Sequence, residues 1–285
     1  MKFVRFEFDN ELKLGFLSKK NDSIHEINAV LKDLKIPEIT NMKDFIEYYC
    51  RNKVDLDKIF KETILEDGPF FLDKIKLKTP VIPSKIICLG LNYVDHAKET
   101  GKRLPKVPML FSKAISSLLD PFDYIELPSK FVDYEVELAI IIGKECKKAS
   151  IEDAAEYIFG FTILNDVSER KVQMSDKQFF RGKSYDTFAP MGPHIVTNLD
   201  TSNLNLELQL NGNVMQKSNT NNLIFNVQQI VSFISEGITL KPGDVIGTGT
   251  PPGVGVAQNP PVFLKSGDKL ELFIENIGKL INFVK

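Results

Sequence analysis

Three acidic residues in two β-type segments are placed where they could bind a metal ion. Glu135 and Glu137 lie two residues apart at the start of an apolar, β-branched run that Gly143 ends. Because side chains alternate faces along a strand, both carboxylates are expected on the same face. Asp166 follows a second apolar segment, residues 159–164, and would add a third carboxylate at a strand end. Three such oxygen donors suit a hard divalent ion such as Mg²⁺ or Mn²⁺.

The Glu-x-Glu pair has a simpler explanation when it is considered alone. Such a pair is typical of the solvated face of a half-buried sheet. In a buried position, the two carboxylates would repel each other unless a cation or a shared proton neutralised them. The metal hypothesis therefore depends on the other polar residues of the chain.

His96 and Glu99 form a candidate general-base dyad. They lie three residues apart in a short segment after an apolar strand, residues 86–90, and residues at this spacing are neighbours on a helix. A carboxylate beside an imidazole fixes its tautomer and lets it take a proton from water. The same spacing also occurs in ordinary surface contacts. The following residues, 101–108, carry Lys102, Arg103 and Lys106 and are expected to form a loop that could serve as a lid.

Cationic and polar side chains follow Asp166 in a segment that is expected to be irregular. Arg170, Gln173, Arg181 and Lys183 could hold an anionic substrate or stabilise a developing oxyanion. A solvated loop is the alternative.

A glycine-rich segment, GDVIGTGTPPGVG, lies near the C-terminal end of the chain. The spacing of Gly247, Gly249 and Gly253 does not fit a dinucleotide-binding fingerprint, and no phosphate-binding lysine follows. The glycines are expected to let the backbone pass close to a ligand, with Thr248 or Thr250 supplying a hydroxyl.

The composition argues against nucleic-acid and membrane binding. The 285 residues include 36 basic and 38 acidic side chains, which gives a formal net charge of −2. No stretch approaches the roughly 20 apolar residues of a membrane span, so a cytoplasmic protein is expected. Cys50, Cys88 and Cys146 are far apart and odd in number, which indicates reduced thiols rather than disulfides.

The pattern of elements predicts a small N-terminal α+β domain, residues 1–78, and a larger, predominantly β domain, residues 79–285. Strands are expected over residues 2–8 and 12–17 and around Ile24, followed by a helix that Asn41 caps and an amphipathic stretch near residues 57–64. Prolines 80 and 83 mark the boundary. Beyond it, helices are expected after Ser150 and over residues 223–236, and strands over residues 204–210 and 268–274 and at the end of the chain.

Several blocks in fixed order resemble the fumarylacetoacetate hydrolase family. They are GLNYVDHAKE, LFSK, DYEVELAIIIGK, GFTILNDVSERKVQ, QFFRGKSYDTFAPMGPHIVT, LNG with the following MQ and SNT, and GDVIGTGTPPGVG. The resemblance covers about residues 80–285 and implies an α+β fold with a mixed β-roll catalytic domain, which typically forms a homodimer.

The resemblance also implies roles for individual residues. It implies one Mg²⁺ or Mn²⁺ ion per subunit on Glu135, Glu137 and Asp166, catalytic roles for His96, Glu99 and Lys183, and substrate contacts from Arg170, Gln173 and Thr250. Around the arginine the family often has an alanine and an acidic residue, where this chain has Ser168, Glu169, Arg170 and Lys171. This departure affects only the expected substrate preference.

The resulting hypothesis is a metal-dependent hydrolase that cleaves a carbon–carbon bond in a small anionic 2-oxo or 1,3-dicarbonyl acid of the acylpyruvate type. Two related reactions use the same enolate without attack by water: decarboxylation of oxaloacetate, and isomerisation or tautomerisation of an unsaturated 2-oxo diacid such as 2-hydroxyhepta-2,4-diene-1,7-dioate. A lyase reaction on a ureido acid such as ureidoglycolate is a further alternative by analogy with the family. A protein that only binds a metal and a ligand is the alternative outside enzymology, and it would not need the His96–Glu99 dyad.

Overall fold

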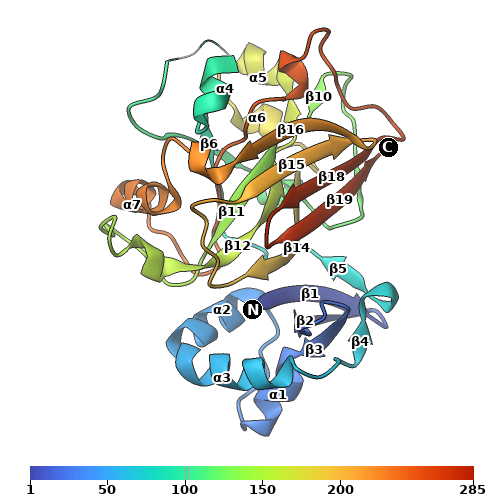
Figure 1. Cartoon of the computed structure of the whole chain (residues 1–285), viewed down its shortest axis with the longest axis vertical. Helices are drawn as coiled ribbons and strands as arrows, with labels where there is room; N and C mark the ends of the chain where they lie inside the picture. Colours follow the sequence, from blue (N-terminus) through green and yellow to red (C-terminus); the bar gives the residue numbers. More distant parts are fainter. Residues whose placement is uncertain (100, 102) are drawn as a thin grey trace.

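The N-terminal part of the chain combines an antiparallel sheet with short helices (Figure 1). The computed structural model describes residues 1–99, 101 and 103–285. Strands β1, β2 and β3 pair in sequence order, and Asn41 caps α2 by accepting a hydrogen bond from the Asp44 amide, as expected. The elements are β1 (Lys2–Phe8), β2 (Glu11–Leu17), β3 (Ser23–Glu26), α1 (Ile27–Asp33), α2 (Met42–Arg51), α3 (Lys53–Thr63), β4 (Phe70–Phe71), η1 (Leu72–Lys74) and β5 (Lys76–Lys78).

The remaining elements are mainly strands. They are β6 (Ile86–Gly90), α4 (Val94–Glu99), β7 (Met109–Lys113), η2 (Ile115–Ser117), β8 (Leu118–Leu119), β9 (Tyr124–Ile125), β10 (Val132–Asp133), β11 (Val136–Ile142), η3 (Ala154–Tyr157), β12 (Ile158–Asn165), β13 (Ser168–Glu169), α5 (Arg170–Asp176), α6 (Phe180–Lys183), β14 (Ala189–Val196), β15 (Asn205–Leu210), β16 (Asn213–Asn219), η4 (Thr220–Asn222), α7 (Val227–Gly237), β17 (Val245–Gly247), η5 (Gly255–Ala257), β18 (Lys269–Ile274) and β19 (Gly278–Val284).

A long mixed sheet runs through both parts of the chain. Among the described residues its main path is β4-β3-β2-β1-β14-β12-β11-β17-β6-β7, and β1 joins the two parts by pairing antiparallel with β14. The neighbours β17 and β6 are parallel. A second sheet has the order β16-β15-β18-β19-β9, and a small one joins β10 to β13. The expected predominantly β, mixed β-roll architecture is therefore confirmed.

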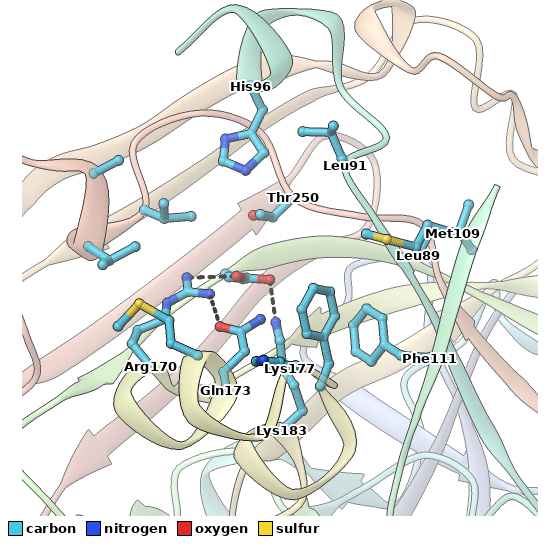
Figure 2. A pocket seen from close by; sticks show the side chains of 17 residues that line it. Leu89, Leu91, His96, Met109, Phe111, Arg170, Gln173, Lys177, Lys183 and Thr250 are labelled. Atoms are coloured by element: carbon cyan, nitrogen blue, oxygen red, sulfur yellow. Dashed lines mark hydrogen bonds and ion pairs between the residues drawn. The ribbon is translucent and has the colours of Figure 1, made fainter. Parts of the chain in front are cut away.

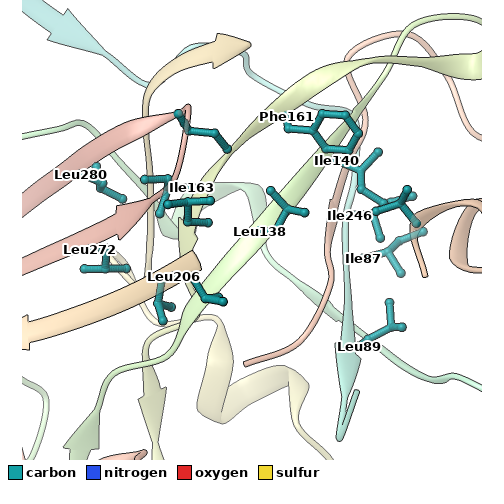
Figure 3. Close-up of a cluster of buried hydrophobic side chains, with 14 of the residues drawn as sticks. Ile87, Leu89, Leu138, Ile140, Phe161, Ile163, Leu206, Ile246, Leu272 and Leu280 are labelled. Atoms are coloured by element: carbon teal, nitrogen blue, oxygen red, sulfur yellow. The ribbon is translucent and has the colours of Figure 1, made fainter. Parts of the chain in front are cut away.

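The main hydrophobic core lies between the two large sheets (Figure 3). Leu138 and Ile140 of β11 and Ile163 of β12 contribute from the long sheet, and Leu206 of β15 and Leu272 of β18 contribute from the second sheet. All five side chains are buried. Strand β11 is covered on both faces, which explains its uninterrupted run of apolar residues after Glu137.

A second core is shared by the N-terminal part and the larger part. The Phe3 ring lies 5.3 Å from the Tyr49 ring and 5.5 Å from the Phe159 ring, measured between centroids. Ile141 of β11 and Ile195 of β14 belong to the same cluster. The division at residues 78 and 79 stays a prediction, but the two parts are not separated by a solvated linker.

Two sequence predictions for local structure are wrong. The segment after Asp166, expected to be irregular, forms β13 and the short helices α5 and α6. The helix expected after Ser150 is reduced to turns and the 3-10 helix η3, although the Ser150 hydroxyl accepts the expected bond from the Asp153 amide. No helix among the described residues is long and apolar enough to span a membrane.

Candidate active site

The three predicted metal carboxylates meet where β11 begins and β12 ends. The register pairs Val136 with Asn165, and the Asp166 amide donates to the Glu135 carbonyl at 2.9 Å. This pairing brings Asp166 next to Glu135 and Glu137, although it lies about 30 residues later in the chain. All three side chains are buried. The solvated-face explanation of the Glu-x-Glu pair is wrong, because this end of the sheet is covered by α5 and α6 (Figure 1).

Two lysines hold these carboxylates from α6 and β7. Lys183 Nζ lies 2.8 Å from Glu135 Oε2 and 2.6 Å from Asp166 Oδ2. Burial alone would lower the pKa of Lys183, but the carboxylates of Asp166 and Glu135 outweigh it and raise this pKa. Lys113 Nζ lies 2.6 Å from Asp166 Oδ1 and also donates to the Lys183 carbonyl, so it fixes both residues.

Glu137 is the carboxylate with the least compensation. Burial, followed by repulsion from Asp166 and Glu135, raises its pKa well above the ordinary value. Its Oε2 accepts a bond from the Gly249 amide at 3.1 Å, while its Oε1 is buried and has no hydrogen-bond partner among the described residues. A Cβ at Gly247 would lie 2.4 Å from Glu137 Oε2, so a larger residue there would displace this carboxylate.

The donor set fits a divalent cation. In the described part of the chain, three residues each place one potential ligand atom within 4.8 Å of the other two: Cys88, Glu137 and Asp166. Both Glu135 oxygens already accept bonds from cations, but a carboxylate offers about four lone-pair sites, so Glu135 can still bind a metal. Since hard cations prefer oxygen, Glu135, Glu137 and Asp166 are the expected ligands and the Cys88 thiol is a neighbour.

Arg170 and Gln173 lie beside the carboxylates on α5. Arg170 Nη2 is 2.7 Å from Glu135 Oε1, and Arg170 Nη1 donates to Gln173 Oε1 at 3.0 Å. Arg170 Nε donates at 2.8 Å to Asp133, whose carboxylate also accepts bonds from the Gly255 and Val256 amides. The arginine is thus held in place by two buried carboxylates.

Lys113 and Asp133 are parts of the site that the sequence did not identify. A signal for Asp133 was present, because Asp133, Glu135 and Glu137 alternate along one segment. Lys113 gave no such signal, since a lysine at a strand end is ordinary. Its role depends on the long-range pairing of β7 with β6, which brings it next to Asp166.

The predicted His96–Glu99 dyad is present on α4. His96 Nδ1 lies 2.8 Å from Glu99 Oε2, and Glu99 Oε1 accepts a bond from the Gly253 amide at 2.9 Å. Just before α4, Asn92 bonds the backbone of Phe225 and Thr248 and so anchors the start of this segment. Of the expected lid, Lys102 lies outside the described residues, and Gly101 and residues 103–108 form no helix or strand.

One cavity of about 360 Å³ is lined by six of the nine predicted site residues, whereas Glu99, Glu137 and Asp166 are not among its lining residues (Figure 2). His96 and Thr250 line it on one side, and Arg170, Gln173 and Lys183 line it on the other. Glu135 is a further lining residue. The Thr250 hydroxyl donates to the Val136 carbonyl and accepts from Gln216, so it can still accept a bond from a ligand but has no proton left to donate. The other walls of the cavity are largely apolar and are formed by Leu89, Leu91, Met109, Phe111, Met174, Phe179, Val254 and Val256.

The chain is similar to known proteins over most of its length. The family model described as fumarylacetoacetate (FAA) hydrolase C-terminal matches residues 85–285. A mitochondrial oxaloacetate tautomerase from Bos taurus is 42% identical over 279 residues, which cover 95% of this chain and 87% of that protein. An uncharacterised protein from Methanocaldococcus jannaschii is 52% identical over 215 residues, which cover 75% of this chain and 87% of that protein.

A solved structure agrees with these relationships. The fumarylacetoacetate hydrolase from Exiguobacterium antarcticum has a TM-score of 0.85 and 37% sequence identity, with 100% of this chain and 99% of that chain covered. The match therefore includes the N-terminal part as well as the larger one. Together, the family match, the relatives and the shared fold show that this chain belongs to the fumarylacetoacetate hydrolase family of enzymes.

Proposed function

We propose that this protein is an Mg²⁺- or Mn²⁺-dependent enzyme that forms the enolate of a short 2-oxo acid, and that its reaction is the keto–enol tautomerisation of oxaloacetate. The observation that carries the proposal is the arrangement of one cavity, with His96 opposite Lys183 and Arg170 (Figure 2). The tautomerase named among the relatives, which aligns with 95% of this chain, supports oxaloacetate as the substrate.

The charge balance of the site supports an added cation and an anionic substrate. In the described part of the site, four buried carboxylates (Asp133, Glu135, Glu137 and Asp166) surround three buried cations (Lys113, Arg170 and Lys183). When all are ionised, the excess is one negative charge. A divalent cation would reverse this sign and leave the site attractive to a carboxylate.

The residues of the chain have distinct tasks in this reaction. A cation held by Glu135, Glu137 and Asp166 would act as a Lewis acid on the 2-oxo group. Arg170 and Gln173 bind the substrate carboxylate and orient it. Lys183 Nζ donates to Glu135 Oε2 and Asp166 Oδ2 and makes a longer contact of 3.4 Å with the Asp166 carbonyl, and its positive charge would stabilise the negative charge that develops on the C2 oxygen.

Proton transfer is assigned to His96. Glu99 accepts a hydrogen bond from Nδ1–H, and Nε2 would be the base that removes a proton from C3 of the substrate and returns it to the enolate. The bond from the Gly253 amide to Glu99 holds the dyad against the glycine-rich loop. The apolar walls limit access of bulk water, which keeps these electrostatic interactions strong.

Hydrolysis of a carbon–carbon bond in an acylpyruvate is the second candidate. In that reaction His96 would remove a proton from water, and the hydroxide would attack the distal carbonyl. The bond between the attacked carbonyl carbon and C3 would break, and an enolate would leave and be protonated. The His96–Glu99 dyad suits this reaction equally well, and the solved fumarylacetoacetate hydrolase shares the fold.

One experiment separates these reactions. Metal-stripped and Mn²⁺-loaded protein are compared on oxaloacetate and on an acylpyruvate, with enol absorbance, deuterium exchange at C3, CO₂ release and carbon–carbon cleavage recorded together. We expect Mn²⁺-dependent enol formation and exchange without CO₂ release. Cleavage of the acylpyruvate as the faster reaction would favour the hydrolase. Loaded protein that binds oxo acids but changes none of them would contradict both and indicate a binding protein.

A further inference from the structure

One face of α5 and its C-cap line the cavity from its buried end to its rim, with three polar side chains and one methionine. Arg170, Gln173, Met174 and Lys177 occupy positions i, i+3, i+4 and i+7, and all four line the cavity. Arg170 at the start of the helix is buried, whereas Lys177 at its C-cap is exposed. The helix therefore presents a second cation to a ligand, at the outer end of the same cavity.

Lys177 differs from Arg170 and Lys183 because it forms no ion pair with a carboxylate of the described residues. Arg170 is paired with Asp133 and Glu135, and Lys183 is paired with Glu135 and Asp166. Among the described residues, no carboxylate lies within 4 Å of the Lys177 ammonium, although its side chain is one of those drawn around the cavity in Figure 2.

The neighbouring acidic residue is held away from Lys177 by another partner. Asp176 accepts bonds from Arg181 Nε and Nη2, both at 2.6 Å, so both of its oxygens are used. Lys177 itself has a left-handed backbone, with φ of 55°, which ends the helix and fixes where its side chain begins. The lysine is positioned by the fold and keeps its charge available.

We propose that Lys177 binds the distal carboxylate of the substrate, so that the enzyme selects short dicarboxylic 2-oxo acids over monocarboxylic ones. This inference rests on the proposed function, which places the 2-oxo acid end of the substrate, where the reaction occurs, near Arg170 and Lys183. The seven-residue step from Arg170 to Lys177 corresponds to roughly 10 Å of helix. A lysine side chain can span part of that length, so a substrate with few carbons between its two carboxylates can reach both ends.

The test compares two substrates whose distal group is either a charged carboxylate or an uncharged methyl ester. Wild-type protein loaded with Mn²⁺ is assayed on oxaloacetate and on its 4-methyl monoester, alongside the variants Lys177→Met and Lys177→Arg. We expect Lys177→Met to lower the kcat/KM ratio of diacid to monoester about tenfold, mainly through KM, because one charge-assisted hydrogen bond is lost. Lys177→Arg should retain most of the ratio.

Lys171→Met is the matched control. Lys171 is exposed on the same helix, lies over the Phe131 ring at 5.8 Å and does not line the cavity, so its loss changes the net charge equally. An equal change in the ratio for this control, or no change for Lys177→Met, would overturn the inference. Oxalate has only two carbons, and no carboxylate of it extends toward Lys177. Its dissociation constants for Lys177→Met and for the wild type should therefore agree within about twofold. A wild type without metal-dependent activity on any oxo acid would instead refute the proposed function, and the inference with it.

Discussion

Glu137 is the residue on which metal binding depends most directly. Its raised pKa means that ionised Glu137 destabilises the metal-free protein, since its charge is buried and two further carboxylates lie close to it. We expect Glu137→Gln to weaken Mn²⁺ binding roughly a hundredfold, because one of three charged ligands is lost. The same change should leave the metal-free protein at least as stable, since it removes repulsion. Calorimetric titration and thermal unfolding without metal measure the two effects, and retained Mn²⁺ affinity would exclude Glu137 as a ligand.

Substitutions in the His96–Glu99 dyad should have a different effect: they should lower activity but leave metal binding unchanged. His96→Asn should lower kcat by about 10²- to 10⁴-fold, the usual contribution of a general base. Glu99→Gln should have a smaller effect, because an amide oxygen can still accept a hydrogen bond although it no longer supplies charge. Steady-state kinetics with saturating Mn²⁺ measures both. Full activity of His96→Asn would assign proton transfer to another group.

The sequence predicted which of these side chains lie close together where the regular geometry of a strand or a helix determines it. Glu135, Glu137 and Asp166 could be paired because strand periodicity is strict, and His96 and Glu99 because helix neighbours lie three apart. Burial could not be predicted in this way. It depends on α5 and α6, which are too short to be stabilised by helix propensity alone and owe their structure to contacts across the fold.

At the scale of elements, Asp133 connects three segments that surround the cavity. It follows Val132 in β10 and accepts bonds from Arg170 on α5 and from the Gly255 and Val256 amides of η5, at the end of the glycine-rich segment. We expect Asp133→Ala to lower the free energy of unfolding by about 3 to 5 kcal/mol, because it leaves a buried guanidinium and two amides without this partner. Urea denaturation measures the change.

Asp176→Ala is the matched comparison for this prediction. It removes another aspartate that pairs with an arginine near α5, but that pair is exposed, so solvent can replace the lost bonds. The two variants should therefore differ clearly in unfolding midpoint. Equal stability of Asp133→Ala and wild type would show that the loop and α5 are held by other contacts.

For the whole molecule, the sequence indicated two parts but not how they join. Residues 1–78 form their own strands and helices, as the alternating pattern predicted. Yet β1 pairs with β14, and Phe3 packs against Phe159. Such pairing between distant segments has no local sequence signal, because each strand shows only that it will be buried and not which partner will bury it.

His194 reports on the junction between the two parts. It lies in β14, next to β1, and its Nε2 has no hydrogen-bond partner among the described residues. Burial, with a smaller effect of Lys2, lowers the pKa of His194 to about 3. The folded protein therefore keeps a neutral imidazole at pH values where the unfolded chain binds a proton.

This difference predicts a specific loss of stability in mild acid. The unfolded chain gains its proton below about pH 6.5, so the His194 contribution to the free energy of unfolding should fall by about 2 kcal/mol between pH 7.5 and pH 5. It should be constant above pH 7.5, where both states are neutral. Urea denaturation of wild type and His194→Gln at several pH values isolates this contribution, because the carboxylates titrate in both proteins. Parallel pH profiles for the two proteins would contradict the prediction and show that the imidazole is accessible to protons in the folded state.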